Sequence, residues 1–163
     1  GGKQVRALTD SIAASKPDMK ILVMGDMNDD PDDTSMAKFL GARREMKEVE
    51  EGDFYNPWWN ILRKDNRGTL SYQGAWNLFD QIVVSKNLLA TQKAKDVKGY
   101  RNAAMQNSSS LTFYGNEIFQ RDYLFQTDGR YKWTPKRTTA GGVWLNGYSD
   151  HLPVVTYFIK EQK

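Results

Sequence analysis

The feature that most constrains this chain is a short apolar run that ends in a cluster of acidic and amide side chains. Residues 21–24 read Ile-Leu-Val-Met, and a run that is apolar at every position is typical of a strand covered on both faces. The chain then turns polar at Asp26 and Asn28. Because ligand sites in open α/β sheets lie beyond the carboxyl ends of strands, this position predicts functional side chains at the rim of a sheet.

The composition is that of one folded domain over residues 1–163. A chain in which 39% of the residues are hydrophobic can bury a core without covalent cross-links. It contains no Cys, which excludes disulfides and thiolate metal sites and leaves its cellular location unassigned. It has no apolar stretch long enough for a membrane span, so we expect no transmembrane segment.

The apolar spacing predicts helices and strands in alternation, which indicates an α/β (α+β) fold. Residues 3–15 have the spacing of a helix, and Asp32, Asp33 or Thr34 is expected to cap a short helix that carries Met36, Phe39 and Leu40. Residues 54–62 are expected to be irregular or helical. The predicted strands are residues 19–24, 69–72, 78–84 and 154–159.

Two side chains directly after the first strand are candidates for catalysis. On an extended segment, residues two apart point the same way, so Asp26 and Asn28 would jointly hold a reacting oxygen and a water molecule. The alternative is an ordinary turn, since Asp and Asn are common turn formers. The residue types alone leave both interpretations open.

His151 is the single histidine of the chain, and it lies at the entry to the last predicted strand. Imidazole accepts a proton from water near neutral pH when an acceptor holds its other ring nitrogen. Asp80, an acidic residue inside a predicted strand, is the candidate acceptor, and Asp150 is a candidate ligand for a divalent cation. The alternatives are structural roles for His151 and Asp80 and a turn role for Asp150.

Three strings occur in the order Gly25-Asp26-Met27-Asn28, residues 76–85 (Trp-Asn-Leu-Phe-Asp-Gln-Ile-Val-Val-Ser) and Ser149-Asp150-His151-Leu152-Pro153-Val154. Taken together, they resemble the endonuclease/exonuclease/phosphatase superfamily with its pancreatic-deoxyribonuclease-like fold. The resemblance implies a phosphoester hydrolase that depends on Mg²⁺ or Mn²⁺. It implies that Asp26 and Asn28 orient the attacking water and the phosphate, that Asp80 steadies the ring of His151, and that Asp150 and Asp26 bind the metal. His151 would act as a base or stabilise charge on phosphorus.

The resemblance covers only the carboxyl-terminal half of the family's domain, because the family's glutamate metal ligand lies upstream of the helix found here at residue 3. It therefore implies one mixed sheet flanked by helices, half of a four-layer α/β/β/α sandwich. We expect the uncovered sheet face to meet a missing amino-terminal half or a second copy of the chain. Without the glutamate, metal binding should be weak and the chain alone weakly active or inactive.

A basic and aromatic stretch is the candidate substrate-binding segment. Arg130, Lys132, Trp133 and Arg137 would contact a phosphoester, which can be a nucleic acid, a phospholipid head group or a small molecule. A second basic group spans residues 93–101, and the alternative for both is a solvated surface. The alternative function is a non-catalytic interaction module that binds polyanions or a protein through Trp58, Trp59 and this segment.

Overall fold

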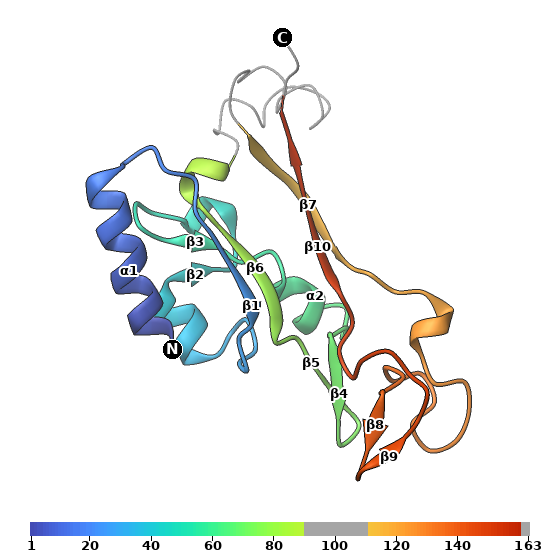
Figure 1. The fold of residues 1–163 in the computed structure, drawn as a ribbon. Coiled ribbons are helices and arrows are strands. Elements are labelled where there is room, and N and C mark those ends of the chain that lie inside the picture. Colours follow the sequence, from blue (N-terminus) through green and yellow to red (C-terminus); the bar gives the residue numbers. More distant parts are fainter. Residues whose placement is uncertain (90–110, 161–163) are drawn as a thin grey trace.

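The computed structural model describes residues 1–89 and 111–160, and a four-stranded mixed sheet lies at its centre (Figure 1). The strand order is β1-β6-β3-β2, in which β6 runs antiparallel to both neighbours and β2 and β3 run parallel. The sheet and its helices confirm the α+β class. The strands are β1 (Leu22–Asp26), β2 (Ala42–Arg43), β3 (Phe54–Tyr55) and β6 (Asp80–Ser85).

Helices cover one face of this sheet. Helix α1 (Gly2–Ser15) confirms the helix predicted for residues 3–15 and packs beside η1 (Ser35–Leu40), a short π-helix. The side-chain cap expected for η1 is not formed. The core on this face consists of Met36, Leu40, Ala42, Phe54 and Val83. The other short helices are η2 (Met46–Glu48), α2 (Trp59–Arg63), η3 (Lys86–Leu88) and η5 (Asp122–Leu124).

An antiparallel ribbon covers the other face of β6. It consists of β7 (Thr112–Ile118) and β10 (Val154–Ile159), and β10 has the bounds predicted from the sequence. Figure 1 shows α1, the central sheet and this ribbon in order from left to right. Trp58 is fully buried in the core below the ribbon, and its Nε1 donates to the Ile82 carbonyl oxygen at 2.9 Å. Trp58 therefore cannot contribute to a binding surface, and that part of the interaction-module hypothesis is wrong.

The strand covered on both faces is β6 and not β1. Val83 contacts the helical side and Val84 contacts the ribbon side, because successive strand residues point to opposite faces. On β1, Leu22 and Met24 are exposed, Met24 by 67%, so the prediction of a doubly covered first strand was wrong. The ribbon packs on β6 and leaves these two side chains open. What covers this face stays a prediction.

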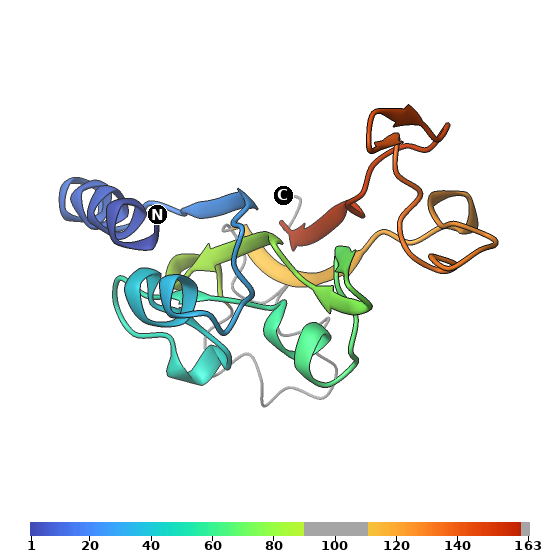
Figure 2. The same ribbon diagram turned by 90° about the horizontal axis from the view of Figure 1, so that it is seen from below.

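Two small antiparallel hairpins complete the described fold. One is formed by β4 (Leu70–Tyr72) and β5 (Ala75–Asn77), and the other by β8 (Thr139–Ala140) and β9 (Val143–Trp144). The second belongs to a segment of residues 121–149, here named the aromatic arm. Figures 1 and 2 both show this arm projecting away from the central sheet.

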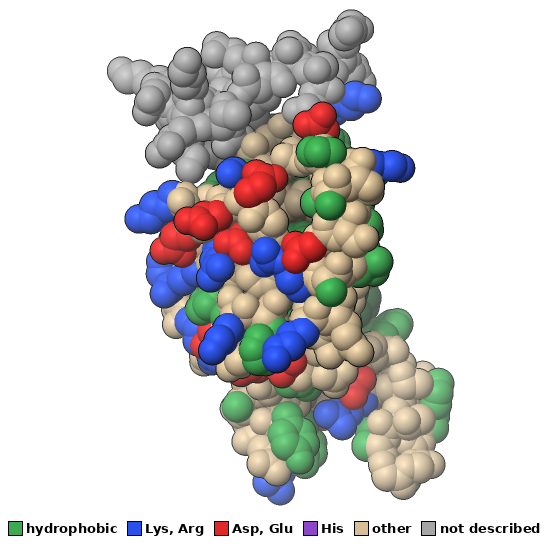
Figure 3. All heavy atoms as spheres, turned by 90° about the vertical axis from the view of Figure 1, so that its left-hand side faces the viewer, with side chains coloured by type: hydrophobic (Ala, Val, Ile, Leu, Met, Phe, Trp, Pro, Cys, Tyr) green, Lys and Arg blue, Asp and Glu red, His purple; other side chains and the backbone are tan. Residues whose placement is uncertain are grey.

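The surface around α1 has mixed charge. Figure 3 shows Lys and Arg interspersed with Asp and Glu on this face. Some of them are paired: Arg6 bridges Asp10 and Asp53, and Arg43 also contacts Asp53. This face therefore offers no large field of one sign to a charged partner. None of the helices within residues 1–89 and 111–160 has the length and hydropathy needed to cross a membrane.

Candidate active site

The centre of the candidate site is a direct contact between Asp80 and His151. Asp80 Oδ2 lies 2.7 Å from His151 Nδ1, and the two residues are 71 positions apart in the chain. Asp80 begins β6, and His151 lies just before β10. The packing of β10 against β6 therefore brings together the pair that the sequence suggested. Both side chains are partly exposed.

Thr69 holds the backbone at Asp80 and next to His151. It is fully buried, its Oγ1 accepts from the Asp80 backbone N at 3.4 Å, and its carbonyl oxygen accepts from Leu152 N at 2.7 Å. The His151 backbone N donates to Ser149 Oγ at 3.0 Å, which closes a local turn. Because Leu152 is itself in the core, the His151 ring is carried on a rigid segment.

Asp26 lies opposite Asp80 in the sheet. The two are register partners at the end of β1 and the start of β6, so their side chains share one face with Cβ atoms about 5 Å apart. Asn28 does not follow the predicted geometry. It has a left-handed φ of 52°, and its backbone N donates to Asp26 Oδ1 at 3.0 Å. The extended segment expected over Asp26 and Asn28 is wrong, because the chain turns there.

A buried polar network beneath the site holds this turn against β6. Asp30 Oδ1 accepts from Leu78 N at 2.8 Å, and Gln81 Nε2 donates to the Asp29 carbonyl oxygen at 2.8 Å. Asn56 Nδ2 donates to Gln81 Oε1 at 2.8 Å. Burial raises the pKa of the Asp30 carboxyl, and this effect exceeds the lowering by the Leu78 hydrogen bond. Sequence reasoning missed Asp30, Gln81 and Asn56, because only their buried positions distinguish them from ordinary polar residues.

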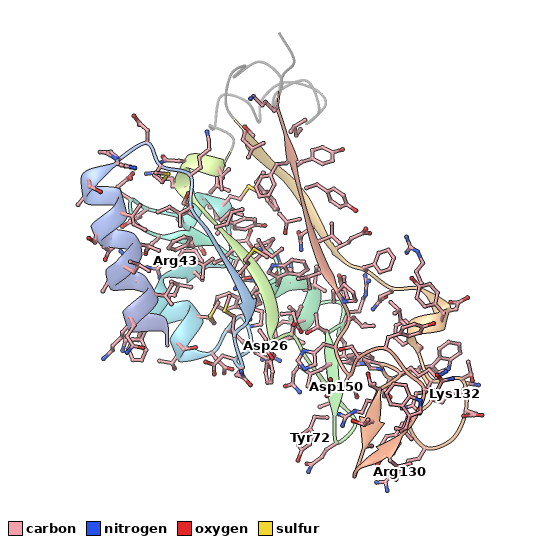
Figure 4. The ribbon with its side chains drawn as sticks, viewed as in Figure 1. Asp26, Arg43, Tyr72, Arg130, Lys132 and Asp150 are labelled. Carbon is pink, nitrogen blue, oxygen red and sulfur yellow. The ribbon has the colours of Figure 1, made fainter. Side chains whose placement is uncertain are left out.

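The candidate metal ligands do not form a complete donor set. Asp150 is exposed, and Figure 4 places it with Asp26 at the same end of the molecule. Within residues 1–89 and 111–160, however, no group of three or more His, Asp or Glu side chains is arranged to hold an ion. Oxygen-ligand cations need six or more donors. The described residues therefore supply at most part of a metal site, and we derive no step through a metal.

Two of the candidate substrate-binding residues, Arg130 and Lys132, lie away from Asp150 and therefore from the neighbouring His151 (Figure 4). Arg130, Lys132, Trp133 and Arg137 all belong to the aromatic arm, where the first three are exposed. Figure 4 shows Arg130 and Lys132 beyond Asp150, on the outer part of the arm. The basic group of residues 93–101 lies outside the described residues.

The geometry of the pair suits proton transfer. An ionised carboxylate only accepts hydrogen bonds, so a charged Asp80 requires a proton on His151 Nδ1 and leaves the lone pair on Nε2. Within the described part of the chain, Nε2 has no hydrogen-bond partner, and the side chain is 26% exposed. The ring can therefore take a proton from a water molecule at the rim of the sheet.

Comparison with known proteins identifies the family of this chain. The chain matches the model of the "Endonuclease/Exonuclease/phosphatase family" over residues 1–160. Searches of curated proteins and of solved structures found no match. Since the family match covers nearly the whole chain, this chain belongs to the endonuclease/exonuclease/phosphatase family, whose members are metal-dependent phosphoester hydrolases.

Proposed function

We propose that this chain is the carboxyl-terminal half of a phosphoester hydrolase domain, and that His151 is its general base. The observation that carries the proposal is the 2.7 Å contact between Asp80 Oδ2 and His151 Nδ1. A charged Asp80 favours the tautomer with the proton on Nδ1 and leaves Nε2 as the basic nitrogen. Family membership supplies the reaction class, phosphoester hydrolysis.

In the proposed step, His151 Nε2 removes a proton from water while the water oxygen bonds to phosphorus. The ester P–O bond breaks, its electron pair stays on the departing oxygen, and that oxygen takes a proton from solvent. Asp80 stabilises the imidazolium that forms, because an opposite charge at hydrogen-bond distance favours the protonated ring. Asp80 acts only through the His151 ring, so it is a positioning residue.

Asp26 and Asn28 are proposed to orient the attacking water and the phosphate. Two observations support this role. Asp26 lies opposite Asp80 in the strand register. The backbone N of Asn28 donates to Asp26 Oδ1, so the turn keeps Asn28 next to Asp26. Asp26 and Asp150 are also the proposed ligands of Mg²⁺ or Mn²⁺, which would neutralise negative charge on the phosphate. Because they provide only part of a donor set, we expect weak metal binding.

Arg130, Lys132, Trp133 and Arg137 are proposed to contact the part of the substrate beyond the reacting phosphate. The exposure of Arg130, Lys132 and Trp133 supports this role, and the aromatic arm that carries them is followed directly by Asp150. A non-catalytic interaction module remains the second candidate, because the same exposed surface needs no chemistry to bind a partner.

The experiment is hydrolysis of an activated small phosphodiester by the purified chain with Mg²⁺ or Mn²⁺. We expect slow turnover that falls about 100-fold, or to background, in His151→Ala, since general bases contribute roughly this factor or more. Tyr114→Ala, a change on β7, is the matched control. Equal rates in wild type and His151→Ala would contradict the catalytic role. Fast turnover would contradict the half-domain proposal.

Metal titration separates the two candidate functions. The hydrolase predicts Mn²⁺ binding that is weakened in Asp150→Ala. Unchanged affinity in this variant would remove Asp150 from the metal site. Binding of polyanions without metal binding or turnover would favour the interaction module.

A further inference from the structure

The aromatic arm has almost no core of its own. Between residues 121 and 149, Pro135 is the only buried residue. Several large apolar side chains exposed on one short segment are typical of a ligand or partner site. The exposed side chains include five aromatic rings: Tyr123, Tyr131, Trp133, Trp144 and Tyr148.

Backbone hydrogen bonds hold the arm in shape, together with Leu124 and Phe125, which pack against the core, and an edge contact between the Tyr123 and Tyr148 rings. Gln126 N donates to the Thr134 carbonyl oxygen and Trp133 N donates to the Gln126 carbonyl oxygen, both at 2.9 Å. Tyr148 N donates to the Lys136 carbonyl oxygen at 2.8 Å, which ties the last part of the arm to its middle. The backbone that carries the rings therefore has a defined shape, although the rings themselves are exposed.

Trp133 is placed at a conformational cost. Its φ is +66°, a left-handed value that is rare for a bulky residue. The side chain is 60% exposed, so burial of the ring does not offset this strain. Strained residues of this kind cluster at ligand-binding sites, which makes Trp133 a candidate contact residue.

Basic side chains alternate with these rings. Arg130 lies over the Tyr131 ring at 5.7 Å from its centroid, and Lys132 lies over the Trp133 ring at 5.4 Å. From residue 121 to 149 the sequence has five Lys or Arg and two Asp, a net charge of +3. The arm thus presents a cationic surface with stacking faces, in contrast to the mixed charges around α1.

We infer that the aromatic arm binds single-stranded nucleic acid, with bases stacked on its exposed rings and backbone phosphates beside Arg130 and Lys132. Unpaired bases stack on aromatic side chains, and basic residues track the backbone. This inference rests on the proposed function. Tyr148 directly precedes Ser149 in the chain, so a nucleic-acid strand bound along the arm would lead toward the Asp80 and His151 pair. A membrane anchor is not favoured, since Val143 and Leu145 are the only large aliphatic side chains exposed beside the five rings of the arm.

The test is fluorescence anisotropy with a labelled oligothymidylate of about 12 nucleotides, within the site sizes of known single-strand binders. Metal is left out, so binding is measured without hydrolysis. We expect binding that weakens as salt rises, because phosphate contacts release counterions. Trp133→Gly, which suits the left-handed backbone, and Trp144→Ala should each weaken binding about 10-fold. Tyr114→Ala, an exposed aromatic outside the arm, is the control and should change nothing.

Three results would overturn the inference: no binding at low salt, equal binding by wild type and both Trp variants, or binding of anionic phosphatidylserine vesicles in place of the oligonucleotide. The result is independent of the catalytic proposal. Hydrolysis of the small phosphodiester without oligonucleotide binding would contradict only the inference that the arm binds nucleic acid. Oligonucleotide binding, with equal hydrolysis rates in wild type and His151→Ala, would contradict only the proposed catalytic role of His151.

Discussion

Asp30 offers the sharpest test of how the fold supports the site, because two substitutions at this position have different consequences. Asp30→Ala removes the acceptor of the Leu78 N–H and leaves a buried amide without a partner. Such an orphaned group costs about 1–3 kcal/mol. The Arg63 ion pair, at 3.4 Å with a partly exposed arginine, adds about 0.5 kcal/mol at most. We therefore expect Asp30→Ala to lower the free energy of unfolding by about 2 kcal/mol.

Asp30→Asn keeps an oxygen for Leu78 and removes the charge whose burial is unfavourable, so we expect a change within about 0.5 kcal/mol. Thermal unfolding measures both variants, and about 2 kcal/mol corresponds to a Tm decrease of about 4–8 °C for a chain of this size. Because the pKa of Asp30 is raised, its stabilising contribution is present at low pH and is lost as pH rises through that pKa. The free energy of unfolding of the wild-type chain should therefore rise relative to that of Asp30→Asn as pH falls. Equal losses in the two variants would refute this reasoning.

Two further changes test the charge pairs of the fold. Asp53→Ala leaves Arg6 and Arg43 without their shared, nearly buried partner and should cost about 2 kcal/mol in urea unfolding; a cost near zero would show that the pair contributes nothing. The hydrogen bond from Arg63 lowers the pKa of Asp32, so its stabilisation is present above pH 3.8 and is lost as pH falls through the lowered pKa. Asp32→Asn should therefore lose about 0.5 kcal/mol at neutral pH, and this gap in Tm should close in acid. A gap that persists at low pH would contradict the assignment.

The parts of the fold that the sequence predicted are those set by local patterns. The helix over residues 3–15 and the strand over residues 154–159 follow from apolar spacing that no tertiary contact overrides. The contact between Asp80 and His151 was also expected, since motif order suggested the pair and the packing of β10 on β6 forms it. Its chemistry stays a prediction.

The parts that were missed depend on what packs where. The run from Ile21 to Met24 is apolar throughout, but pattern alone could not show that the ribbon covers β6 and leaves β1 open. Asn28 turns left-handed because the Asp26 carboxylate captures its backbone N–H. The sequence could not show that Gln81 and Thr69 hold the site in place, because only their buried positions distinguish them from other polar residues.

The most direct test of the central claim is nitrogen NMR of the histidine ring, which is unambiguous because the chain has one histidine. If Asp80 holds the ring, neutral His151 carries its proton on Nδ1, and the Nε2 signal shifts when dimethyl phosphate and Mg²⁺ are added. In Asp80→Asn this tautomer preference should be lost. A ring protonated on Nε2 in the wild-type chain, or identical spectra for both proteins, would contradict the account.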